Sequence, residues 1–169
     1  TDIIRMAQTY TPELPSTLRA ELRDYQKEGY YWLARLAHWG VGGCLADDMG
    51  LGKTIQSLAV VLQLAANGPS LVVAPTSVST NWQSEVTRFT PTINIKFFSG
   101  KDRKKPIKSL GKFDLLITTY TLLQQESELL SSVQWQTVIL DEAQAIKNAA
   151  TKRSQAAMSL QARFKLITT

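Results

Sequence analysis

The sequence is poor in cysteine and histidine and has no long apolar run. Its 169 residues include one cysteine and one histidine, which excludes an internal disulfide and the usual zinc ligand sets. No apolar segment approaches the ~20 residues that span a bilayer, and no basic-then-apolar secretion signal is present. We therefore predict an intracellular protein without membrane association, in the cytoplasm or nucleoid of a bacterium or the nucleus of a eukaryote.

The composition is that of an ordinary globular domain, with 44% hydrophobic and 20% charged residues. The length suits one domain with a sizeable core, and the net charge of +5 is compatible with a polyanionic partner. The chain starts at Thr1 and stops at Thr169, which suggests a monomeric fragment of a longer protein. Residues 1–17 are predicted to form an extended lead-in, and residues 18–169 the folded unit.

Apolar, strand-like segments alternate with helical patterns along the chain. Strands are expected at 41–46, 71–74, 93–98, 115–118, 135–140 and 164–168, and helices at 24–40, 55–66, 78–89, 122–130 and 151–160. This alternation predicts an α/β fold with three layers, a mostly parallel sheet carrying helices on both faces. Asp24 is expected to cap the first helix, and Trp32, Trp82 and Trp135 to pack in the core.

A glycine-rich run at 46–54, Ala-Asp-Asp-Met-Gly-Leu-Gly-Lys-Thr, joins the first strand to a helix. Gly50 and Gly52 would let backbone N–H groups face phosphate oxygens at the positive end of that helix. Lys53 would reach the β/γ-phosphates and the Thr54 hydroxyl would hold Mg²⁺. The general pattern has a further glycine where this chain has Asp47. A glycine turn with a solvated lysine is the alternative.

An acidic pair, Asp141 and Glu142, follows the apolar strand that ends at Leu140. Because ligands of parallel sheets sit at the carboxyl ends of the strands, this pair would face the phosphate loop. Asp141 then becomes the Mg²⁺-side carboxylate and Glu142 the base that orients the attacking water. Without the phosphate loop, the same pair would be an ordinary polar loop.

At this point the chain resembles the Swi/Snf-type ATPases, the double-stranded-DNA translocase branch of the superfamily-two helicases, over residues 22–169. Residues 22–29 are similar to the family's Q-like motif, which implies that Gln26 reads adenine. Residues 45–54 are similar to its phosphate loop, where Asp47 is normal. The resemblance assigns ATP binding to Asp48, Met49, Gly50, Leu51, Gly52, Lys53 and Thr54, with Mg²⁺ held by Thr54 and Asp141.

Two further segments resemble motifs that lie along the DNA track in that family. Residues 72–77, with Trp82 and Glu85, are similar to motif Ia, and residues 116–120 to motif Ib. The resemblance implies DNA contacts for Thr76, Ser77, Thr118, Thr119 and Tyr120. From the residues alone, Thr118 and Thr119 could equally end a strand and cap the next helix.

The segment at 141–144 reads Asp-Glu-Ala-Gln where many members have Asp-Glu-Ala-His. Glutamine does not change charge near neutral pH, so any coupling of hydrolysis to DNA through Gln144 must use neutral hydrogen bonds. Residues 166–169 resemble the start of motif III. A basic run at 101–108, with five Lys or Arg in eight positions, is interpreted as solvated surface rather than a DNA contact.

The resemblance implies a first RecA-like P-loop lobe that binds ATP and Mg²⁺ and acts on double-stranded DNA. A second RecA-like lobe of the parent chain would complete hydrolysis with arginines, and turnover would remodel or displace protein–DNA complexes. Two alternatives stay open. One is a different P-loop NTPase or kinase, and the other is a non-catalytic lobe that uses nucleotide as an interaction switch.

Overall fold

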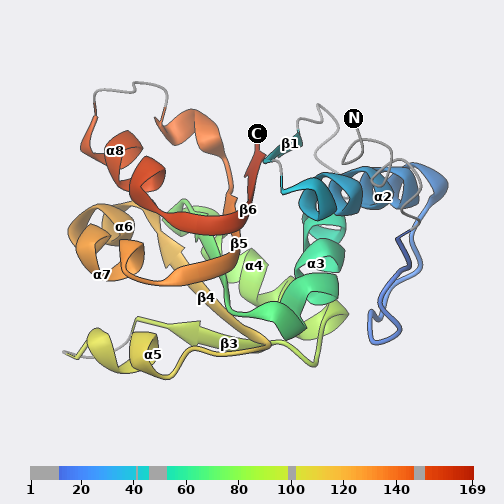
Figure 1. Cartoon of the computed structure of the whole chain (residues 1–169), viewed down its shortest axis with the longest axis horizontal. Helices are drawn as coiled ribbons and strands as arrows, with labels where there is room; N and C mark the ends of the chain where they lie inside the picture. The colour runs from blue at the N-terminus through green and yellow to red at the C-terminus, as the bar shows by residue number, and fades with distance from the viewer. Residues whose placement is uncertain (1–11, 41, 46–52, 99–101, 147–150) are drawn as a thin grey trace.

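The computed structural model describes residues 12–40, 42–45, 53–98, 102–146 and 151–169 (Figure 1). Six parallel strands form one sheet in the order β1-β6-β5-β2-β4-β3. The strands are β1 (Gly43–Leu45), β2 (Ser70–Ala74), β3 (Asn94–Phe97), β4 (Asp114–Thr119), β5 (Gln134–Leu140) and β6 (Gln161–Thr168). All six predicted strands are confirmed, and every strand pairing that the structure describes is parallel.

Helices cover both faces of this sheet, as the predicted three-layer α/β class requires (Figure 1). The α-helices are α2 (Asp24–Trp39), α3 (Lys53–Leu64), α4 (Thr76–Phe89), α5 (Lys104–Lys108), α6 (Tyr120–Gln125), α7 (Ser127–Ser131) and α8 (Lys152–Ser159). Short 3-10 turns occupy Ala65–Asn67 and Ala143–Ile146. Among the described helices, none is both long and apolar enough to cross a bilayer.

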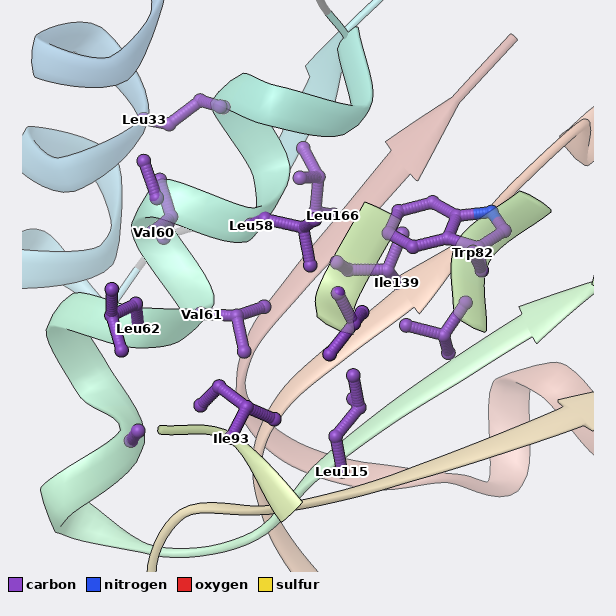
Figure 2. Close-up of a cluster of buried hydrophobic side chains, with 14 of the residues drawn as sticks. Leu33, Leu58, Val60, Val61, Leu62, Trp82, Ile93, Leu115, Ile139 and Leu166 are labelled. Carbon is purple, nitrogen blue, oxygen red and sulfur yellow. The ribbon is translucent and has the colours of Figure 1, made fainter. Parts of the chain in front are cut away.

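Alternate side chains of each central strand enter two separate cores. In β2, Val72 and Ala74 pack with α2, α3 and α4, whereas Leu71 and Val73 pack with α6, α7 and α8. Figure 2 shows the first core, in which Leu58 of α3 and Trp82 of α4 gather over the sheet. Because a strand turns successive side chains to opposite faces, a continuously apolar strand needs a helical layer on each side.

Two local predictions about helices need correction, and one short helix was not predicted. The segment 122–130 is divided between α6 and α7, which meet at Glu126. Residues 104–108 of the basic run form α5, a short helix whose last turn is basic. Asp24 is the first residue of α2 and not its cap, which is Arg23, whereas Gly40 ends that helix with φ of 73° as predicted.

The predicted core position of Trp32 is also wrong. Trp32 is 47% exposed and Tyr25 46% exposed, whereas Tyr30, Leu33 and Ala34 form the buried face of α2. Aromatic residues surround this helix on several sides, so its sequence offers more than one apolar face, and packing against α3 selects one of them. Trp82 and Trp135 are buried, at 3% and 0% exposure, as predicted.

The parallel arrangement brings all six carboxyl strand ends to the same edge of the sheet. Register places Val73 beside Leu140 and Leu140 beside Ile167. The residues that follow these strands therefore meet above the central strands β2, β5 and β6. This edge is where a parallel α/β sheet places its ligand.

Candidate functional site

A small cavity of about 170 Å³ lies at the carboxyl edge of the sheet. It is lined by Lys53, Thr54, Val78, Asn81, Trp82, Glu85, Asp141 and Glu142. The fold thus brings together four of the predicted ATP-site residues, namely Lys53, Thr54, Asp141 and Glu142. Two larger cavities, of about 720 and 760 Å³, contain none of the predicted site residues, so the smaller one is the candidate site on chemical grounds.

Lys53 and Thr54 form the first turn of α3, directly after the predicted phosphate loop. The Lys53 ammonium donates a hydrogen bond to the backbone carbonyl of Thr169. The Thr54 side chain lines the cavity together with Glu85 and lowers the pKa of that carboxyl against the larger effect of burial. The other loop residues predicted to bind ATP, residues 48–52, lie outside the described residues.

Asp141 is fixed from several directions at the end of β5. The indole N–H of Trp82 donates to Oδ2 over 2.7 Å, and the Thr168 hydroxyl donates to Oδ1. Its backbone carbonyl accepts from the Tyr120 hydroxyl at 2.7 Å, and its backbone N–H donates to Val73 at 2.8 Å. Each carboxylate oxygen can accept two hydrogen bonds, so Asp141 keeps acceptor capacity toward the cavity.

Glu142 has a backbone φ of 50°, which is unusual for a residue that carries a side chain. Such a left-handed conformation costs of order 1–3 kcal/mol and persists where the surrounding structure fixes it, commonly at functional sites. The exposed Gln144 side chain donates from Nε2 to Glu142 Oε2. A neutral amide therefore contacts the predicted base, as expected for a glutamine at this position.

Glu85 adds a third carboxylate to the cavity. Burial raises its pKa above the ordinary value, against the opposing effects of the Thr54 hydrogen bond and of nearby Arg88. Its Oε2 atom is buried and has no hydrogen-bond partner among the described residues. A buried carboxylate oxygen without a donor is costly, so this atom points to a water, ion or ligand hydrogen that completes the site.

The predicted DNA contacts separate into accessible and buried residues. Thr76 and Ser77 are exposed at the start of α4, and Thr119 is partly exposed. Thr118 and Tyr120 are each 2% exposed, and the Tyr120 hydroxyl is used by Asp141. Thr118 and Tyr120 are therefore buried inside the fold. Thr118 lies within the central strand β4, and Tyr120 begins α6 and donates its hydroxyl to the residue that follows β5.

Thr119 has a structural task as well, since its hydroxyl accepts from the Leu122 backbone N–H at 3.2 Å and caps α6. Burial and the charges of Asp141 and Glu142 raise the pKa of Tyr120, so its hydroxyl stays protonated and donates. Of the two interpretations of the strand end at 118–119, helix capping is confirmed for Thr119. A DNA contact by the same residue stays a prediction.

Gln26 lies in the first turn of α2, is 7% exposed, and does not line the cavity. Its side-chain oxygen accepts from the Arg23 backbone N–H at 2.8 Å. The amide oxygen thus stabilises the start of α2, which leaves the amide N–H₂ for a nucleotide base. The predicted adenine contact stays a prediction.

Three side chains at the site were not assigned a chemical role from the sequence. Trp82 was assigned to the core, and it both packs there and donates to Asp141. Glu85 lines the cavity beside Thr54, and Thr168 reaches the site by its hydrogen bond to Asp141. The available signal was the i, i+3 spacing of Trp82 and Glu85, which puts both side chains on one face of α4.

The donor set fits a magnesium-bound triphosphate. Within the part of the chain that the structure describes, no three His, Cys, Asp or Glu residues cluster as a complete metal cage. Mg²⁺ rarely uses such a cage, because it retains waters and binds through one or two carboxylates plus substrate phosphates. Asp141, the Thr54 hydroxyl and the Lys53 ammonium supply the matching oxygen ligands and countercharge.

The fold and this site define a P-loop type α/β lobe, and comparison with known proteins identifies the family. The model of the SNF2-related domain matches residues 25–169. The chain therefore belongs to the SNF2 family of ATPases. The resemblance recognised in the motifs is confirmed.

Relatives from bacteria, fungi and archaea agree with this assignment. A putative ATP-dependent helicase/translocase YwqA of Bacillus subtilis is 45% identical over 151 residues, covering 85% of this chain and 16% of that protein. The chromatin-remodeling ATPase INO80 of Cryptococcus neoformans is 41% identical over 171 residues, covering 92% of this chain and 10% of that protein. The chain thus spans a minor part of each of these curated relatives.

A solved structure shares the fold closely. The Sulfolobus solfataricus SWI2/SNF2 ATPase core in complex with double-stranded DNA has a TM-score of 0.84 and 37% identity, covering 95% of this chain and 34% of that one. The SWI2/SNF2 ATPase core domain of the same organism gives a TM-score of 0.81 and 35% identity, covering 96% of this chain and 34% of that one.

Proposed function

We propose that this chain is the ATP-binding lobe of an SNF2-type double-stranded-DNA translocase. Its parent chain would couple ATP hydrolysis to remodelling or displacing protein–DNA complexes. This would take place in the compartment that contains the DNA, the bacterial cytoplasm or nucleoid or the eukaryotic nucleus. One observation carries the proposal: a single cavity collects Lys53 and Thr54 from the start of α3 and Asp141 and Glu142 from the end of β5. These segments are distant in sequence, and their cation, hydroxyl and carboxylates are the groups with which P-loop NTPases bind phosphate and Mg²⁺.

Each residue has a task that follows from its position. Lys53 exchanges its hydrogen bond to the Thr169 carbonyl for one to a β/γ-phosphate oxygen, a stronger, charge-assisted interaction. Thr54 and Asp141 would hold Mg²⁺, which would supply positive charge against the phosphates. Glu142 accepts a hydrogen bond from water and orients it toward the γ-phosphate, while Gln144 holds the Glu142 carboxylate in place.

DNA would be contacted at the start of α4. Thr76 and Ser77 are exposed there, and the N-terminal end of a helix carries partial positive charge that favours a phosphate. Thr119 is the last residue of β4, which neighbours β2, and the register pairs it with Ala74. The DNA-bound SWI2/SNF2 structure, which shares this fold, supports duplex DNA as the partner.

The test is steady-state ATP hydrolysis by the parent chain, including its second lobe, with and without duplex DNA. We expect duplex DNA to stimulate hydrolysis strongly and Lys53→Ala to abolish it, because no other described cation lines the cavity. Glu142→Gln serves as a second variant that should bind ATP and fail to hydrolyse it. Hydrolysis that ignores DNA would reject the translocase in favour of another NTPase, and phosphate transfer to a small acceptor would indicate a kinase.

A further inference from the structure

Helix α4 contributes four of the eight residues that line the cavity, although no nucleotide contact is expected from it. Val78, Asn81, Trp82 and Glu85 follow one another at helical spacing, so they form one face of α4. This face lies between the start of α3 and the end of β5. It therefore touches both segments that carry the predicted Mg²⁺ ligands.

Trp82 provides the contact to β5. Its indole is 3% exposed and packs in the core with Ile139 and Leu166, at one end of the cluster in Figure 2. A ring held this firmly presents its N–H in one direction only. That direction is Asp141 Oδ2, 2.7 Å away.

Glu85 provides the contact to α3. It lies one helical turn after Trp82 and lines the cavity together with Thr54. Burial raises the pKa of Glu85 and the Thr54 side chain acts in the opposite direction, so the two side chains interact at the cavity. The second oxygen of Glu85 is buried without a partner among the described residues and lines the same cavity as Lys53.

We propose that α4 is the positioning element of the Mg²⁺-nucleotide site, with Trp82 orienting the Asp141 carboxylate and Glu85 orienting the Thr54 hydroxyl. The inference rests on the proposed function, since it assigns the residues that hold the Mg²⁺ ligands of that ATP site in position. Partners that orient metal ligands typically contribute about 10–100-fold to metal affinity. One rigid helix would thus set the distance between two ligands that come from different parts of the chain.

The matched variants are Trp82→Phe and Trp135→Phe in the parent chain with its second lobe. Both remove a buried indole, and Trp135 also donates its N–H, to the Leu130 carbonyl at 3.0 Å. Trp135 belongs to the opposite core, with α6, α7 and α8. The two variants therefore make the same chemical change, one at the site and one away from it.

The measurement is a calorimetric Mg²⁺ titration with a non-hydrolysable ATP analogue present, together with the affinity for the analogue in EDTA. We expect Trp82→Phe to raise the Mg²⁺ midpoint about tenfold or more and to leave the EDTA affinity unchanged. Trp135→Phe should shift neither value by more than about twofold. Glu85→Gln should raise the Mg²⁺ midpoint too, with the exposed Glu128→Gln as its control.

Each outcome decides a separate point. If Trp82→Phe lowers the thermal unfolding temperature more than Trp135→Phe does, Glu85→Gln decides the positioning role. Unshifted midpoints in both Trp82→Phe and Glu85→Gln would overturn the inference while leaving the proposed function intact. Absence of Mg²⁺-dependent analogue binding in the unmodified chain would overturn both.

Discussion

At the scale of single residues, the site is built from polar groups that each serve the fold and the chemistry. Tyr120 is buried to 2% exposure and donates its hydroxyl to the Asp141 carbonyl. This bond anchors the turn that presents Asp141 and Glu142 beyond β5. Glu142 keeps its left-handed backbone at φ 50° within that turn.

Tyr120→Phe should lower the free energy of unfolding by about 0.5–1.5 kcal/mol, because it removes the hydrogen bond to the partly buried Asp141 carbonyl. Urea unfolding of the lobe measures this loss. Tyr25→Phe is the control, since Tyr25 is 46% exposed and its hydroxyl reaches water. In the parent chain, DNA affinity should stay unchanged in Tyr120→Phe, and a marked loss of affinity would restore Tyr120 as a DNA contact.

At the scale of elements, most of the proposed contacts with nucleotide and DNA phosphates lie at the first residues of helices. Helices α3, α4 and α6 all begin at the carboxyl edge of the sheet, after the phosphate loop, β2 and β4. Their N-terminal ends therefore point toward the face where phosphates would bind, where partial positive charge is favourable. Thr119 lies at one such start and combines a capping role with a proposed DNA contact.

Thr119→Ala should cost about 1 kcal/mol of stability because it removes the cap of α6. Thr151→Ala is the matched control, since the Thr151 hydroxyl caps α8 in the same way, accepting from the Ser154 N–H at 3.2 Å. We expect similar losses in urea unfolding. In the parent chain, only Thr119→Ala should also reduce stimulation of hydrolysis by duplex DNA, and equal stimulation in the two variants would leave Thr119 as a cap alone.

At the scale of the whole molecule, the charged residues of the cavity indicate which part of the reaction this lobe can perform by itself. The cavity contains one lysine and no arginine among its lining residues. Phosphoryl transfer in related P-loop enzymes depends on an arginine worth about 10³–10⁵ in rate. The described part of this lobe does not bring such an arginine to the cavity, so we expect it from the second lobe.

The isolated lobe should therefore bind a non-hydrolysable ATP analogue with Mg²⁺ while hydrolysing ATP at least about 10³-fold more slowly than the parent chain. Steady-state assays on both, normalised to bound analogue, measure the ratio. Circular dichroism of the lobe controls for folding. Comparable rates in the two proteins would show that the lobe carries all of its catalytic groups itself.

Much of this fold could be predicted because its signals are local. The strands β2, β4 and β5 are buried on both faces and are mostly apolar, with few polar residues such as Thr137 inside them, so the parallel α/β class follows. The ends of helices and the choice of their buried face are harder to predict where several residues give the same local signal. The exposed Trp32 of α2 shows the limit, because periodicity detects apolar residues and does not select among several apolar faces.

The sequence by itself determined the α/β class and the family, and it predicted the residues of the ATP site, because motif residues act through local backbone and side-chain chemistry. Only the tertiary structure decided which of these residues meet. It buried Thr118 and Tyr120, and it placed Trp82 against Asp141 and Glu85 against Thr54. Contacts between α4, α3 and β5 depend on strand order and register, which are properties of the packed sheet and not of any one segment.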